Sequence, residues 1–174
     1  GQSNRITLLR ASKGDGKPDL KRTFLDHLSS PFGVALVGGD LYVANTDSLM
    51  RFPYKEGDEQ ITDADQPFLP LPGGPIDHHW TKSLAASPDS KLLYVGVGSN
   101  SNVAEFGMHE EENRAAILEV DIATGALRVF AGGLRNPVGM DWNPVTGELW
   151  TVVNERDEIG SDLVPDYMTS VQDG

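Results

Sequence analysis

A repeated strand pattern constrains the fold of this chain more than any other feature of its sequence. A short apolar segment, a turn and the triplet leucine, aromatic residue, β-branched residue recur three times, and glycine opens the first and third copies. The aromatic residues of the triplets, Tyr42, Tyr94 and Trp150, are 52 and 56 residues apart. A period near fifty residues with several short strands in each repeat is typical of β-propeller blades. The repeat therefore predicts an all-β fold, a β-propeller.

Further strands are expected outside these repeated cores. Residues 48–52 follow the first copy, and residues 116–121 and 127–130 flank a Thr-Gly turn as a hairpin after the second. No segment shows the periodicity of an amphipathic helix. We expect blades at about residues 5–75, 76–132 and 133–174, the last one incomplete.

Three blades are too few to close a ring, because propellers close with roughly four to eight. A chain of 174 residues holds about three to three and a half repeats of this length. We therefore expect residues 1–174 to be one partial propeller domain, part of a longer protein. An arc completed by a second copy is the alternative, and exposed blade edges predict some self-association.

Composition excludes several classes of function. The net charge is −12, from 14 basic and 26 acidic residues, which argues against nucleic-acid partners and anionic membrane surfaces. Cysteine is absent, which excludes disulfides and thiolate chemistry. The apolar runs are strand-sized, so no membrane insertion is expected. No phosphate-binding glycine loop is found, which argues against nucleotide-dependent chemistry.

The segment Gly-Leu-Arg-Asn-Pro-Val-Gly at residues 133–139 is the first candidate site. Its glycines permit unusual torsions and its proline stiffens the turn. Arg135 then offers a fork of donors, and Asn136 one donor and one acceptor, on a constrained loop. The alternative is an ordinary turn whose arginine is solvated.

Two adjacent histidines, His78 and His79, form the second candidate. On an extended segment they point to opposite faces, so they rarely bind one metal together. A histidine in a cleft is the usual general base near neutral pH. The alternative is a pair of surface or packing histidines.

Acidic segments form the remaining candidates. The loop at residues 154–162 contains Asp157, Glu158 and Asp162, and its oxygen atoms suit calcium, although acidic loops are often only solvated. Residues 12–19 resemble a calcium-binding loop that lacks some of the usual ligands, so we expect a turn there rather than a calcium site. The three glutamates at residues 110–112 predict a solvated loop.

In combination, these motifs resemble one known family. Residues 79–89, 97–102, 133–139, 148–157 and 162–167 are similar to the soluble glucose, aldose-sugar and L-sorbosone dehydrogenases that use pyrroloquinoline quinone (PQQ). The sorbosone dehydrogenase-like branch is the most similar. The resemblance implies a six-bladed propeller, PQQ and calcium as cofactors, and oxidation of a sugar or sugar aldehyde.

The resemblance also implies roles for individual residues. His79 matches the family's general base, and Arg135 and Asn136 match the pair lining the PQQ pocket. Asp162, with main-chain carbonyls around Asp157 and Glu158, matches the calcium loop. An external electron acceptor and a periplasmic or secreted location are implied as well.

The chain departs from the family in three ways. A glutamine that the family has near its first inner strand is not evident around residues 28–32. His78 stands where soluble glucose dehydrogenase has an aspartate, which leaves open what orients the base. The cofactor contacts of the family's later blades lie outside these 174 residues, so we expect this chain alone to be inactive. The alternatives are a non-catalytic propeller module that binds carbohydrate or protein, and a calcium-dependent hydrolase of the lactonase type.

Overall fold

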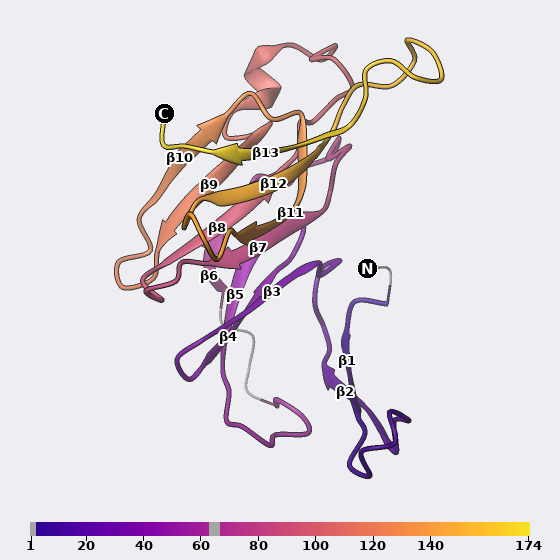
Figure 1. The fold of residues 1–174 in the computed structure, drawn as a ribbon, viewed down its shortest axis with the longest axis vertical. Coiled ribbons are helices and arrows are strands. Elements are labelled where there is room, and N and C mark those ends of the chain that lie inside the picture. The colour runs from indigo at the N-terminus through magenta and orange to yellow at the C-terminus, as the bar shows by residue number, and fades with distance from the viewer. Residues whose placement is uncertain (1–2, 63–66) are drawn as a thin grey trace.

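The computed structural model describes residues 3–62 and 67–174, which form four antiparallel sheets (Figure 1). An N-terminal ribbon pairs β1 (Ile6–Arg10) with β2 (Leu20–Leu25). The first blade contains β3 (Gly33–Val37), β4 (Asp40–Ala44), β5 (Ser48–Pro53) and β6 (Pro67–Pro70). The second contains β7 (Lys82–Ala86), β8 (Leu92–Val97), β9 (Ala116–Asp121) and β10 (Leu127–Gly132). The third contains β11 (Asn136–Trp142), β12 (Leu149–Asn154) and β13 (Tyr167–Val171).

The predicted all-β class is confirmed. Within the described residues the helical content is one 3₁₀ turn, η1 (Met108–Glu111). The segment 5–75, expected as one blade, contains two sheets, the ribbon and the first blade; its residues 63–66 lie outside the described part. Residues 12–19 form the turn between β1 and β2, where the Ser12 hydroxyl donates a hydrogen bond to Asp19. The third blade, which was expected to be incomplete, ends with β13 paired to β12.

The second strands of the first two blades, β4 and β8, are buried on both faces, which explains their apolar sequences. Alternate side chains of a strand point to opposite faces. In β8, Leu93 and Val95 pack towards the first blade, while Tyr94 packs towards the third. In β4, Tyr42 belongs to the core shared with the second blade, and Val43 to the core shared with the ribbon. Each interface between sheets therefore has its own apolar core.

The first strands of successive blades lie side by side, β3 against β7 and β7 against β11. A Cβ atom on Gly33 would come within 2.5 Å of the Lys82 carbonyl oxygen, so this approach requires glycine. The Ser83 hydroxyl joins β7 to β11, because it donates to Pro137 O at 3.2 Å and accepts the Gly139 N–H at 2.9 Å. The start of each first strand pairs with the end of the second strand in its blade. The loops at these positions consequently gather at one end of the blades.

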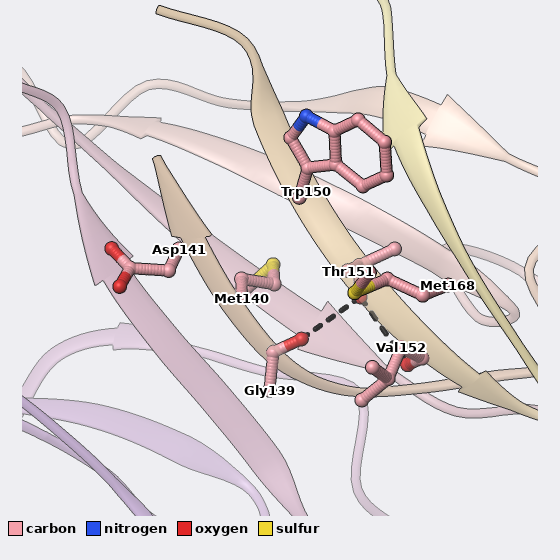
Figure 2. A pocket seen from close by; sticks show the side chains of 7 residues that line it. All are labelled: Gly139, Met140, Asp141, Trp150, Thr151, Val152 and Met168. Carbon is pink, nitrogen blue, oxygen red and sulfur yellow. Dashed lines mark hydrogen bonds between the residues drawn. The ribbon is translucent and has the colours of Figure 1, made fainter. Parts of the chain in front are cut away.

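The third blade has a different environment on its other face. Met140, Trp150, Val152 and Met168 line a hollow of about 240 Å³ there (Figure 2). Val152 and Met168 are 45% and 65% exposed. No helix within residues 3–62 and 67–174 is long and apolar enough to cross a membrane.

Candidate active site

His79 lies on the loop that enters β7, and its ring is fixed by one hydrogen bond. Nδ1 is 2.7 Å from the carbonyl oxygen of Ser99, which follows β8. A carbonyl oxygen only accepts, so Nδ1 carries the proton and Nε2 has a free lone pair. This contact supplies the orienting partner that the sequence left open.

The surroundings of His79 keep its ring neutral. Burial lowers the pKa of His79 from its ordinary value of 6.5, and the electrostatic influence of Arg135 and of the neighbouring His78 acts in the same direction. The hydrogen bond to Ser99 and the charge of Asp157 oppose this shift without reversing it. At pH 7 the imidazole is therefore a neutral acceptor at Nε2, which is the form required of a general base.

Asn136, the first residue of β11, and His79 both pack against Gly98. A Cβ atom on Gly98 would lie 2.4 Å from Asn136 Oδ1 and 2.5 Å from His79 Cβ, so only glycine fits between them. The Asn136 side chain is buried, with 7% of its surface exposed, and its Oδ1 has no hydrogen-bond partner. A buried amide oxygen without a partner is costly, and it marks a position where a ligand donor would be favourable.

Arg135 makes hydrogen bonds to two of the loops near His79. Its Nε donates to Asn102 O at 2.9 Å and its Nη2 to Asn102 Oδ1 at 2.8 Å. Its Nη1 donates to the carbonyl oxygens of Asn154 and Glu155, and its Nη2 also contacts Asp157 Oδ2 at 3.2 Å. The sequence led us to expect a fork of donors open to a ligand. The structure instead shows each guanidinium nitrogen engaged with protein, clamping the loop after β8 to the loop after β12.

The acidic loop follows β12, and Figure 1 shows it extending from the upper end of the third blade. Asp157, Glu158 and Asp162 line one hollow of about 490 Å³ formed by residues 155–166. Across residues 3–62 and 67–174, no three histidine or carboxylate side chains are grouped closely enough to hold a metal ion. The predicted ligands thus share a hollow but are not assembled into a cluster.

A buried ionic network holds the loop that carries His79, and sequence reasoning missed it. The Asp77 carboxylate contacts Lys82 Nζ at 3.5 Å and Arg114 Nη2 at 3.3 Å, and accepts a hydrogen bond from the Thr46 hydroxyl. The Lys82 side chain is fully buried, which lowers its pKa, and Arg114 is 3% exposed. Asp77 is two residues before His79, so this network anchors the loop that carries His79 to the first and second blades.

Glu111 was expected in a solvated loop, and this expectation is wrong. Its Oε1 accepts hydrogen bonds from the hydroxyls of Ser99 at 2.9 Å and Ser101 at 2.7 Å. Its Oε2 accepts the Asn100 N–H at 2.9 Å. No local signal distinguishes Glu111 from its two neighbours, because its partners lie ten to twelve residues earlier.

Comparison with known proteins finds one relative by sequence and several solved structures of similar fold. It is 24% identical over 159 residues to an uncharacterized protein of Borreliella burgdorferi, covering 86% of this chain and 40% of that protein. A Trichoderma reesei structure of the carbohydrate-active enzyme family AA12 matches with a TM-score of 0.76 and 21% identity, over 97% of this chain and 46% of that one.

Two further solved structures are PQQ enzymes by name. The holo PQQ domain of pyranose dehydrogenase from Coprinopsis cinerea matches with a TM-score of 0.74 and 17% identity, over 92% of this chain and 41% of that one. PQQ-bound aldose sugar dehydrogenase from Streptomyces coelicolor matches with a TM-score of 0.69 and 19% identity, over 99% of this chain and 55% of that one.

These likenesses establish the propeller fold that the sequence repeat predicted. The chain spans about half the length of the solved relatives and less of the Borreliella protein. A family model described as TrAA12-like matches residues 8–170. The chain therefore belongs to the TrAA12-like family.

Proposed function

We propose that the full-length protein is a PQQ-dependent dehydrogenase of a sugar or sugar aldehyde, L-sorbosone being the first substrate to test. His79 is the general base that takes the proton of the substrate hydroxyl at Nε2. One observation carries this proposal: Nδ1 of a neutral, half-buried imidazole is bound to Ser99 O at 2.7 Å, which leaves Nε2 as the acceptor. The named PQQ enzymes among the relatives support the same chemistry.

The residues beside His79 fit a bound quinone. Asn136 presents a buried amide oxygen without a partner, which suits a donor on the cofactor. Arg135 has one partner that is easily exchanged, since Asp157 is 77% exposed at its side chain. Arg135 and Asn136 would hold PQQ, and a cation at this position favours negative charge on a nearby oxygen. When bound, PQQ supplies a two-electron acceptor for hydride.

The acidic loop is our proposal for the calcium site. Asp157, Glu158 and Asp162 line the same hollow, and carboxylate oxygens with main-chain carbonyls are the ligands that calcium prefers. Because the three side chains are not yet grouped, binding would require the loop to contract around the ion. Calcium would supply positive charge beside the cofactor pocket.

The partners follow from the chemistry. A dehydrogenase that stores two electrons needs an external acceptor to release them, in addition to its sugar substrate. We place this reaction in the periplasm or outside the cell. The exposed Val152 and Met168 on the third blade support self-association of a partial ring (Figure 2).

Replacing the base tests this proposal. In full-length protein loaded with PQQ and calcium, His79→Gln should lower kcat about 10²- to 10⁴-fold in a dye-reduction assay, because proton removal loses its acceptor. PQQ binding, followed by absorbance, should persist. The acid limb of kcat/KM in the wild type should have its midpoint below pH 6.5, since activity requires neutral His79.

His27→Gln is the matched control, because this histidine is 86% exposed on the N-terminal ribbon side and should leave kcat unchanged. If adding PQQ and calcium to the full-length protein produces no absorbance change, the dehydrogenase is excluded and the non-catalytic binding module is favoured. If PQQ binds and His79→Gln keeps full activity, the base is a different residue.

A further inference from the structure

Ser99 makes hydrogen bonds to His79 and to two of the residues around it. Its carbonyl oxygen accepts from His79 Nδ1 at 2.7 Å, and its N–H donates to Arg135 O at 2.7 Å. Its hydroxyl donates to Glu111 Oε1 at 2.9 Å. The orientation of the His79 ring therefore depends on where Ser99 is held, and one of the groups that holds it is a carboxylate.

Glu111 binds this segment at three consecutive residues. Besides Ser99, its carboxylate accepts from the Asn100 N–H at 2.9 Å and the Ser101 hydroxyl at 2.7 Å. The Ser101 hydroxyl also accepts the Ala104 N–H at 2.8 Å, so its proton is directed at Glu111. All three partners donate, and only a group with two accepting oxygens can satisfy them together.

Burial makes this arrangement rigid. Ser99, Asn100 and Ser101 are 6%, 4% and 0% exposed. Water therefore does not compete effectively for their donors, and hydrogen bonds to a charged acceptor in such surroundings are strong. The backbone N–H of Arg114 also donates to Glu111 O at 3.0 Å, which ties η1 to the ionic network behind the base.

We propose that Glu111 is a positioning residue for His79, which it controls through the carbonyl group of Ser99. The inference rests on the proposed function, because positioning matters only if His79 acts as the base. Glu111 holds the Ser99 carbonyl against the imidazole, and this carbonyl keeps the proton on Nδ1 and the lone pair on Nε2. A ring in the other tautomer would present N–H to the substrate and could not accept its proton.

The variant Glu111→Gln preserves the shape of the side chain but replaces one accepting oxygen by an amide donor. That donor must face either the Asn100 N–H or the two serine hydroxyls, so at least one of the three hydrogen bonds is lost. We expect Ser99 to shift and the His79 tautomer to become mixed. Glu112→Gln is the matched control, since Glu112 is adjacent in sequence and exposed.

The decisive measurement is the ¹⁵N NMR spectrum of labelled histidines in the full-length protein without PQQ, which reports the tautomer directly. Wild type and Glu112→Gln should show His79 protonated at Nδ1, and Glu111→Gln should show a mixture. The resonances of His27 and His109, which are exposed, should not change and serve as internal references, while an unchanged circular dichroism spectrum shows that the variant is folded. An unchanged His79 tautomer in folded Glu111→Gln overturns the proposal.

Kinetics give an independent readout in the loaded enzyme. Glu111→Gln should lower kcat about tenfold with little change in KM, because the base is misplaced while substrate contacts remain. Its acid limb should move to lower pH, because the Ser99 contact raises the pKa of His79 while Arg135 and His78, which lower it, are still present. A uniform loss of activity at every pH, with the limb unmoved, would contradict positioning.

A second variant covers the case in which Glu111→Gln does not fold. Ser99→Ala removes one of the three hydrogen bonds and leaves the Asn100 and Ser101 bonds in place, so a smaller shift in the same tautomer ratio is expected. No shift in Ser99→Ala would overturn the proposal. If the tautomer changes but neither wild type nor variant oxidises any sugar, the positioning stands and the proposed function fails.

Discussion

The loop that carries His79 and the acidic loop at residues 155–166 lie at the same end of the blades but are held in opposite ways. Behind His79, Asp77 is 13% exposed and contacts two buried cations, Lys82 and Arg114. In the acidic loop, Asp157 is 77% exposed at its side chain, and residues 157–166 are exposed throughout.

The difference in burial distinguishes the His79 loop from the acidic loop in how each would function. On the proposed function, His79 must be oriented before the substrate arrives, and buried charges and hydrogen bonds of the chain itself hold its loop. A calcium loop can adapt on binding, because calcium tolerates irregular oxygen ligands. Under the same proposal, the buried part of the site is preorganised and the exposed loop would be completed by its ligand.

The largest effect on the difference between the two loops is expected from removing the negative charge of Asp77. Asp77→Asn leaves Lys82 and Arg114 buried without their counter-charge, so the free energy of unfolding should fall by about 3–5 kcal/mol. Urea denaturation of the full-length protein measures this change. Asp26→Asn, at a carboxylate that is 56% exposed, should change it by less than about 0.5 kcal/mol. Equal effects of the two variants would show that the network does not anchor the loop.

Much of the fold could be predicted from local sequence. The Leu-aromatic-β-branched triplets lie in β4, β8 and β12, and in β4 and β8 alternate residues face two different apolar cores. The predicted strand 116–121 coincides with β9. The strand β13 was missed, because Tyr167–Val171 follows an exposed loop and becomes a strand by pairing with β12.

Only those parts of the site that form a recognisable local sequence motif could be predicted; contacts between residues far apart in the sequence could not. The motifs around His79 and Asn136 identified the loops that the structure brings together. The pairing of Asp77 with Arg114 spans 37 residues, and isolated charged residues give no sign of such a partner. The same limit applies to Arg135, whose bonds to the carbonyls after β12 depend on the packing of two loops.

A smaller effect is expected for the ligands of the acidic loop. Asp162→Asn removes one charged oxygen from the hollow and should weaken calcium binding to the full-length apoprotein about tenfold, as measured by calorimetry. The histidine spectrum should stay unchanged, because the His79 loop is held independently. Asp141→Asn, on the outer face of the third blade, is the control and should bind calcium like the wild type. If Asp162→Asn also binds normally, the calcium ligands lie elsewhere.

The smallest effect should come from the one carboxylate that organises the acidic loop itself. Asp166 accepts the Glu155 N–H at 2.9 Å and Asn154 Nδ2 at 2.8 Å, and these bonds lower the pKa of Asp166 below 3.8. Its ionised form therefore stabilises the loop above about pH 4, and this contribution is lost as the pH falls through the lowered pKa.

Hydrogen exchange of the Glu155 amide measures this contribution. At pH 6, Asp166→Asn should exchange this amide a few-fold faster than wild type, with the Ser99 amide unchanged. After correction for intrinsic rates, the two proteins should converge as the pH falls through the pKa of Asp166, because protonation removes the charge that the variant already lacks. If the Ser99 amide loses protection together with Glu155, the two loops open as one unit, and the independence inferred from their burial is wrong.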